Sequence, residues 1–226
     1  MNNFSLNPVL PSKEQIQQLP IFQNLPLQQI QVIHSLQQCH AIEQELKTCT
    51  LFGFDSESKP TFNKGEVSTG PHLIQLASRD KAYLFQISPA ILEFLKPIFE
   101  NKNQMKVGFG LKNDAHLFRK KGIELHNVIE LSKCFSAFGL SNPMGLKNAM
   151  ALLFQVNFPK SKKISTSNWA RKILTPHQIE YAAADAYAPV LVFEELLRLG
   201  LLPKTITRHL FKLSMQPNTI KAETDA

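Results

Sequence analysis

The chain has 226 residues, 43% of them hydrophobic, which is enough to bury one large core. No run of 18 or more apolar residues occurs, and the N-terminus lacks the basic start and apolar stretch of a secretory signal, so neither a membrane span nor export is expected. A formal net charge of +7 suits a polyanionic partner.

The three cysteines, Cys39, Cys49 and Cys134, are odd in number and widely spaced. Because no CxxC pair occurs, they support neither a zinc knuckle nor a disulfide framework. A reducing compartment fits, and the cytoplasm is the simplest expectation.

The first half of the chain predicts strands alternating with helices. Ser12 and Gln15 form a capping-box pattern that opens a short helix. The expected elements that follow are a short strand over 29–34, a helix over 35–46, a strand over 48–56, a hairpin of strands over 72–78 and 83–87, a helix over 89–100, a strand over 106–109, a helix over 113–121 that ends at Gly122, and a strand over 127–131.

The second half predicts helices alone, over 132–138, 145–155, 176–199 and 204–213, with a short turn near Trp169. Such a chain should form a mixed sheet with helices packed on it. We therefore expect an α/β fold with residues 1–26 as an N-terminal arm with a short helix, 27–213 as one domain, and 214–226 as a disordered polar tail.

Four acidic residues and one tyrosine stand in apolar surroundings, where an unpaired charge is costly. Asp55 and Glu57 end the strand over 48–56, and residues two apart in a strand share a face. Alone, this pair would be typical of a solvent-facing strand end. Four clustered carboxylates, however, carry enough charge to balance two divalent metal ions, which indicates metal-assisted phosphodiester cleavage.

Asp114 follows a Gly-x-Gly turn at the start of a predicted helix. Its simplest interpretation is an acid that favours the N-terminal end of the helix dipole, which a metal-binding role does not exclude. Gly108 and Gly110 do not make a dinucleotide site, because Asn113 stands where the third glycine of GxGxxG would be.

Tyr181 and Asp185 are four residues apart and so lie on one face of a helix whose start is marked by Thr175, Pro176 and Gln178. A surface hydrogen bond between them is the simple alternative to a catalytic role. Pro189 has no N–H for the Asp185 carbonyl, so a kink or break is expected just beyond Asp185.

In this order, the blocks resemble the DEDD superfamily of 3′–5′ exonucleases, and within it the tyrosine branch with ribonuclease D and the Werner-syndrome exonuclease domain. The likeness spans roughly residues 27–200 and is closest to compact stand-alone bacterial members. Supporting segments are 53–60 (GFDSESKP), 73–76 (LIQL), 167–169 (SNW) and 174–187 (LTPHQIEYAAADAY). Glu180 stands where the histidine branch carries its histidine.

The resemblance implies a ribonuclease-H-like fold with a five-stranded mixed sheet in the order 3-2-1-4-5, flanked by helices. It implies that Asp55, Glu57, Asp114 and Asp185 ligate two Mg²⁺ or Mn²⁺ ions, and that Tyr181 orients the attacking water. Carboxylate oxygens are the ligands that such hard cations prefer. The implied activity is hydrolysis of DNA or RNA from a free 3′ end, releasing nucleoside 5′-monophosphates.

Candidate nucleic-acid contacts come from position in the chain and not from a sharp motif. Lys163 and Arg171 lie in a basic stretch over 160–172 and are the expected phosphate contacts, and His116 is expected near the terminal nucleotide. Trp169 is either a core anchor or a base-stacking surface. Substrate grip should come from the core domain, the N-terminal arm or an oligomer.

Two other functions stay open from the sequence. One is an exoribonuclease specialised for short oligoribonucleotides. The other is a non-catalytic nucleic-acid-binding module, which the presence of all four carboxylates and the tyrosine disfavours. No motif chooses DNA over RNA, since that choice depends on contacts to the 2′-hydroxyl.

Overall fold

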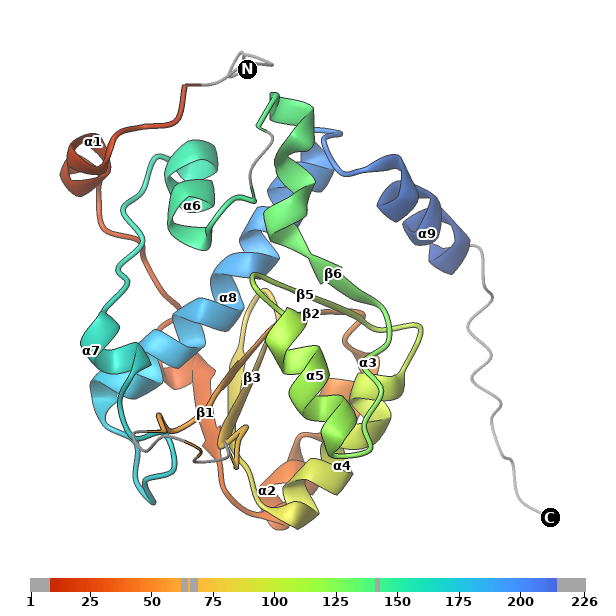
Figure 1. Cartoon of the computed structure of the whole chain (residues 1–226). Coiled ribbons are helices and arrows are strands. Elements are labelled where there is room, and N and C mark those ends of the chain that lie inside the picture. The colour runs from red at the N-terminus through yellow and green to blue at the C-terminus, as the bar shows by residue number, and fades with distance from the viewer. Residues whose placement is uncertain (1–8, 62–64, 66–68, 141–142, 215–226) are drawn as a thin grey trace.

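A single twisted sheet with helices on both faces forms the centre of the molecule (Figure 1). The computed structural model describes residues 9–61, 65, 69–140 and 143–214, so the predicted tail lies outside the described residues except for its first residue. The strands are β1 (Ile30–Ile33), β2 (Leu51–Glu57), β3 (Leu73–Ala77), β4 (Ala82–Gln86), β5 (Met105–Gly108) and β6 (Val128–Glu130).

The sheet order is β1-β4-β3-β2-β5-β6. The β2–β3–β4 meander is antiparallel, whereas β1 pairs with β4, β5 with β2 and β6 with β5 in parallel. The five expected strands thus have the expected order 3-2-1-4-5. The strand expected over 29–34 is confirmed as β1, and because it joins the edge beside β4, the sheet has one strand more than the five that the resemblance implied.

The helices are α1 (Lys13–Gln18), η1 (Leu27–Gln29), α2 (Leu36–Ala41), α3 (Glu43–Thr48), α4 (Pro89–Glu100), α5 (Lys112–Lys120), η2 (Leu131–Phe138), α6 (Leu146–Phe154), α7 (Lys162–Ser165), α8 (Pro176–Arg198) and α9 (Lys204–Ser214), where η marks 3₁₀ geometry. The helix expected over 35–46 is split at Ile42, a buried residue whose φ of −113° is not helical. None of the helices in the described ranges has the length and apolar character needed to cross a membrane.

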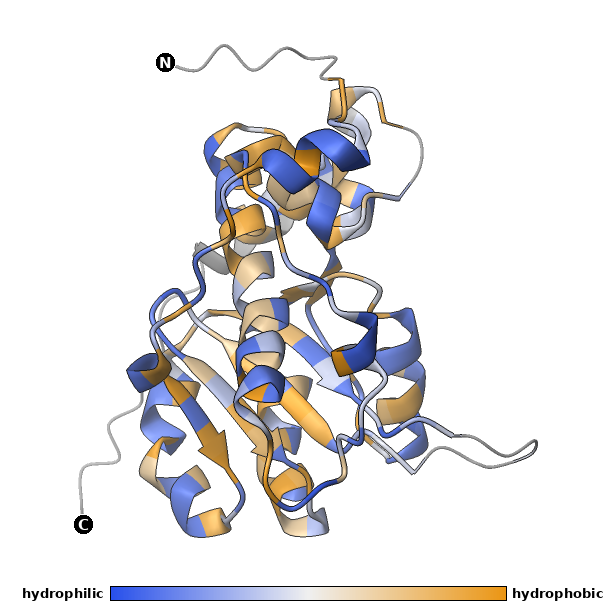
Figure 2. Cartoon of the chain, turned by 90° about the vertical axis from the view of Figure 1, so that its left-hand side faces the viewer, coloured by the Kyte–Doolittle hydropathy of each residue, from blue (hydrophilic) through white to orange (hydrophobic). Residues whose placement is uncertain are grey.

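Alternation along β2 divides its side chains between two cores. Phe52 and Phe54 face α4 and α5, where Phe54 packs against Phe99 and Phe118 with ring centroids 5.6 and 5.7 Å away. The opposite face is covered by α8, which presents the small residues Ala182, Ala183 and Ala186 to the sheet. Figure 2 shows hydrophobic colours along the strands and mixed colours on the surrounding helices.

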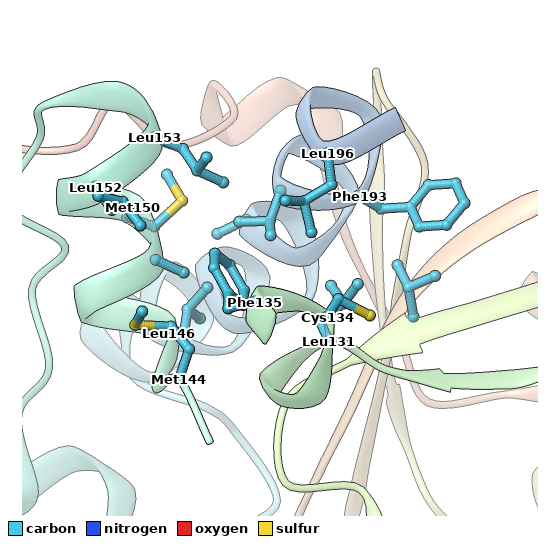
Figure 3. Close-up of a cluster of buried hydrophobic side chains, with 14 of the residues drawn as sticks. Leu131, Cys134, Phe135, Met144, Leu146, Met150, Leu152, Leu153, Phe193 and Leu196 are labelled. Carbon is cyan, nitrogen blue, oxygen red and sulfur yellow. The ribbon is translucent and has the colours of Figure 1, made fainter. Parts of the chain in front are cut away.

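A third core joins α6, η2 and the C-terminal half of α8. Leu153 of α6 points toward Leu196 of α8, whereas the Phe193 ring of the same core points away from α6, as Figure 3 shows. This core anchors the C-terminal half of α8 and so fixes where its N-terminal half lies along the sheet.

Helix α8 lies unusually close to β2. Gly53 makes this approach possible, because a Cβ at that position would collide with the carbonyl oxygen of Ala186. Of the kink or break expected beyond Asp185, the break is wrong: α8 continues from Pro176 to Arg198 across Pro189. Asp185 directly precedes Ala186, and Asp55 lies two residues after Gly53. The close contact therefore brings Asp185 beside Asp55.

Candidate metal centre

Three carboxylates converge where β2 ends beneath α8. Ligand oxygens of Asp55, Glu57 and Asp185 all lie within 4.8 Å of one another. Asp55 and Glu57 share a strand face by their spacing, and Asp185 arrives from the helix that Gly53 admits. Asp185 is only 4% exposed.

The pKa values of all three carboxyl groups are raised above their ordinary values. Burial raises the pKa of Asp55, and the negative charges of Asp185, Asp114 and Glu57 add to the rise. Burial and the charge of Asp185 raise the pKa of Glu57 to about 8, although Lys160 opposes them. Burial raises the pKa of Asp185 too, against the charge of Lys160 and a bond from Tyr181. The cluster therefore lacks positive charge.

The donor set fits a hard divalent cation. Asp185 Oδ1 is buried and has no hydrogen-bond partner among the described residues, and Lys160 Nζ lies 3.9 Å from it. An unpaired buried carboxylate oxygen costs free energy unless a ligand satisfies it. Three carboxylates with one such oxygen match the oxygen ligands that Mg²⁺ and Mn²⁺ take in proteins.

Asp114 lies outside this group of three. It is buried in the first turn of α5, and its carboxylate accepts a hydrogen bond from the hydroxyl of Ser56. Ser56 faces the opposite side of β2 from Asp55 and Glu57. Burial raises the pKa of Asp114, and the Ser56 bond opposes the rise. Three of the four expected carboxylates thus lie together, and Asp114 is close enough to influence Asp55 and Glu57 electrostatically.

The turn that places Asp114 is held by a second acid. Gly110 has a φ of +77°, which favours glycine. Glu130 accepts hydrogen bonds from the backbone N–H of Gly110 at 3.0 Å and of Leu111 at 2.8 Å. Glu130 thereby fixes the start of α5 relative to β6.

Tyr181 faces the carboxylates from α8. Burial raises the pKa of its hydroxyl, and the charges of Asp185, Glu57 and Asp55 raise it further, so the phenol stays protonated at neutral pH. Trp169 packs against it with ring centroids 6.0 Å apart. Because Trp169 is fully buried and donates to the Ser165 carbonyl at 3.1 Å, it is a core anchor, and the base-stacking alternative was wrong.

The other predicted nucleic-acid contacts are His116 on α5, and Lys163 and Arg171 near the N-terminal end of α8. His116 is exposed on α5, about 200° around the helix from the buried Asp114, so it points in a different direction. Lys163 and Arg171 line a separate cavity of 580 Å³ beside the N-terminal end of α8.

Sequence reasoning missed two residues near the centre. Lys160 was counted only within the basic stretch, yet its ammonium is the one that lies 3.9 Å from Asp185. Gln75 pairs with Asp55 across β2 and β3 and is fully buried, and neither of its side-chain amide atoms has a hydrogen-bond partner in the described part of the chain. For Gln75, the available signal was a glutamine within the apolar segment LIQL.

Comparison with known proteins gives a consistent family. A family model described as 3′-5′ exonuclease matches residues 30–200. The mouse bifunctional 3′-5′ exonuclease/ATP-dependent helicase WRN is 32% identical over 169 residues, covering 70% of this chain and 12% of that protein. A 3′-5′ exonuclease of Arabidopsis thaliana is 30% identical over 142 residues, covering 60% and 49%. The chain thus spans less than half of the length of these relatives.

Solved structures share the fold at low sequence identity. The EXO domain of Aedes aegypti Nibbler superposes with a TM-score of 0.68 at 22% identity, covering 84% of this chain and 99% of that one. Escherichia coli RNase D gives 0.61 at 20% identity, with 82% and 50% covered. Trypanosoma brucei RNase D in complex with RNA U12 gives 0.67 at 15% identity, with 94% and 77% covered.

Proposed function

Because this chain belongs to the 3′-5′ exonuclease family, we propose that it hydrolyses DNA or RNA from a free 3′ end and releases nucleoside 5′-monophosphates. The observation that carries the proposal is the group formed by Asp55, Glu57 and Asp185, whose ligand oxygens lie within 4.8 Å of one another inside the matched segment. An RNA-bound structural neighbour supports a nucleic-acid substrate.

Asp55, Glu57 and Asp185 would hold Mg²⁺ or Mn²⁺, and Asp114 would join them for a second ion once its carboxylate turns from Ser56. When bound, these ions supply positive charge to the scissile phosphate and make water a better nucleophile. The protein contributes a fixed set of oxygens, because β2 and α8 are held together by the Gly53 contact.

Tyr181 would orient the attacking water through its hydroxyl. Its raised pKa keeps the proton on the phenol, so the group acts as a hydrogen-bonding partner and not as a general base. The ring of Trp169 packs against the ring of Tyr181 and holds it in place. Glu180 stands where a histidine would mark the sister branch, and Tyr181 stands four residues before Asp185, which supports assignment to the tyrosine branch.

Lys160 would contact the phosphate that approaches Asp185. Its side chain is 50% exposed and lies beside the carboxylates, so it can attract a polyanion to a site that otherwise repels one. The wider net charge of +7 favours the same partner.

The test is digestion of 5′-end-labelled single-stranded DNA, double-stranded DNA and RNA with Mg²⁺ or Mn²⁺. Wild type should shorten the substrate stepwise from the 3′ end, and Asp55→Ala should not. Asp80→Asn is the matched control, because Asp80 is exposed in the β3–β4 turn. Equal activity of wild type and Asp55→Ala would reject the proposal and favour a non-catalytic binding module. Comparison of dinucleotides with long oligonucleotides tests for a short-oligoribonucleotide specialist.

A further inference from the structure

An N-terminal strap, residues 20–27, lies across the end of α8 that carries Tyr181. It precedes the segment that matches the family model, which begins at residue 30. The strap is tied down by the Phe22 N–H, which donates to the Asn157 carbonyl at 3.0 Å, and by the Asn157 N–H, which donates to the Pro20 carbonyl at 2.8 Å. The Asn24 side chain donates to the Glu180 carbonyl of α8 at 2.9 Å.

A cavity of 530 Å³ opens between this strap, α7 and α8. Its volume falls in the ~300–1,000 Å³ range of small-molecule sites. One wall is aliphatic, with Ile21, Leu25 and Leu27 from the strap facing the same space as Ile164 of α7. Ile21 and Leu27 are 55% and 59% exposed, so these large apolar side chains reach the cavity without being covered.

The cavity adjoins the carboxylate site through two of its lining residues. Tyr181 and Lys160 line it, and Lys160 is the residue 3.9 Å from Asp185. Lys147 of α6 is a second cation on its wall. The one acid among the lining residues, Glu180, has His177 as a partner at 3.9 Å. Apolar walls beside two lysines complement a flat base attached to a phosphorylated sugar.

We propose that the N-terminal strap forms a nucleoside-binding wall, and that this cavity holds the base and sugar next to the scissile phosphate. The inference rests on the proposed exonuclease function and adds a substrate contact from outside the matched family segment. Aliphatic side chains contact the face of any base, whereas hydrogen-bonding groups would select one. Such a wall suits an enzyme that must accept each successive nucleotide.

The kinetic test compares Ile21→Ser/Leu27→Ser with wild type on single-stranded DNA and RNA oligonucleotides. Because the contact exists before and during the reaction, KM should rise about fivefold or more with kcat nearly unchanged. Leu197→Ser is the control, since Leu197 is 46% exposed on α8 and about 24 Å along the helix from Tyr181. Thermal melting should be alike for all three proteins, because the replaced side chains are already exposed.

A second measurement does not need turnover. Oligonucleotides with 4-thiouridine or 4-thiothymidine at the last or the penultimate position are photo-crosslinked to the full chain, and the crosslinked peptides are mapped by mass spectrometry. Crosslinks to residues 21–27 or to Ile164 support the proposal. Unchanged KM together with crosslinks confined to other segments would overturn it. A chain that binds and crosslinks there but shows no nuclease activity would reject only the exonuclease function.

Discussion

The two faces of the central sheet differ in whether their buried polar groups are hydrogen-bonded. On the face toward α4, the fully buried Lys106 donates to the carbonyls of Ile98, Asn101 and Gln104 at 3.1, 2.9 and 2.8 Å. Between the other face and α8, Asp185 Oδ1 and the Gln75 side-chain amide have no hydrogen-bond partner within the described ranges. Satisfied buried groups support the fold, whereas unsatisfied ones are sites where an external ligand gains free energy.

The hydrogen bonds of Lys106 explain why this buried charge needs no external ligand. An ammonium has three N–H donors, and here each finds a carbonyl near the C-terminal end of α4, where the helix dipole favours a cation. Burial lowers the pKa of Lys106 to about 8, so the group is still mainly protonated at neutral pH. Asp55 of β2 and Asp185 of α8 have no comparable set of donors among the residues described, and burial raises the pKa of both.

The largest expected effect is a loss of exonuclease activity without a loss of stability, caused by a substitution of Asp185. Asp185→Asn should lower exonuclease activity about a thousandfold, or ~4 kcal/mol, because it removes a cation ligand. The metal-free variant should melt at the wild-type temperature or above, since one of three repelling charges is gone. Activity assays and thermal melts in EDTA measure the two effects, and a large drop in the EDTA melting temperature would show that Asp185 is structural.

A substitution of Lys106, on the face toward α4, should instead lower stability and leave activity nearly unchanged. Lys106→Met keeps an unbranched apolar stem out to Cε but leaves three buried carbonyls without their donor, so stability should fall by about 3 kcal/mol. The activity of the folded fraction should stay near that of wild type. Urea unfolding with activity normalised to folded protein checks this, and a variant that is stable but inactive would contradict the contrast between the faces.

Gly53→Ala tests the contact that joins the helix to the site. The added methyl collides with the Ala186 carbonyl, which should destabilise the protein by about 2 kcal/mol and move Asp185 away from Asp55. Mn²⁺ affinity, measured by calorimetry, should fall with it. Gly145→Ala is the control, because a Cβ there meets open space. Unchanged Mn²⁺ affinity in Gly53→Ala would show that the packing of α8 does not set the site.

The smallest expected effect is the pH dependence of the metal-free protein. Folded Glu57 keeps its proton up to about pH 8, whereas unfolded Glu57 loses it near 4.5, so the folded state binds more protons in between. Raising the pH through this window should therefore lower the free energy of unfolding, by about 1–2 kcal/mol after allowance for solvent screening.

Two conditions should flatten that dependence. Glu57→Gln removes the titrating group, and saturating Mn²⁺ stabilises the deprotonated site by binding only the folded state. Thermal melts between pH 5 and 8.5 compare the three cases. Equal slopes in EDTA and in Mn²⁺ would argue against a cation site at these carboxylates.

The sequence by itself determined what depends on spacing within one element. Asp55 and Glu57 share a face because a strand has a period of two, and Tyr181 and Asp185 share a face because a helix returns after about four residues. The capping boxes at Ser12 and Thr175 were predicted for the same reason, since a cap involves residues three apart.

Only the tertiary structure decided what depends on contacts between distant elements. It brought Lys160 to the carboxylates in place of Lys163, buried Trp169, turned Asp114 toward Ser56, and added β1 to the sheet edge. Packing also kept α8 continuous across Pro189. These outcomes follow from how side chains and backbone fill the space between α8 and β2, which local periodicity does not encode.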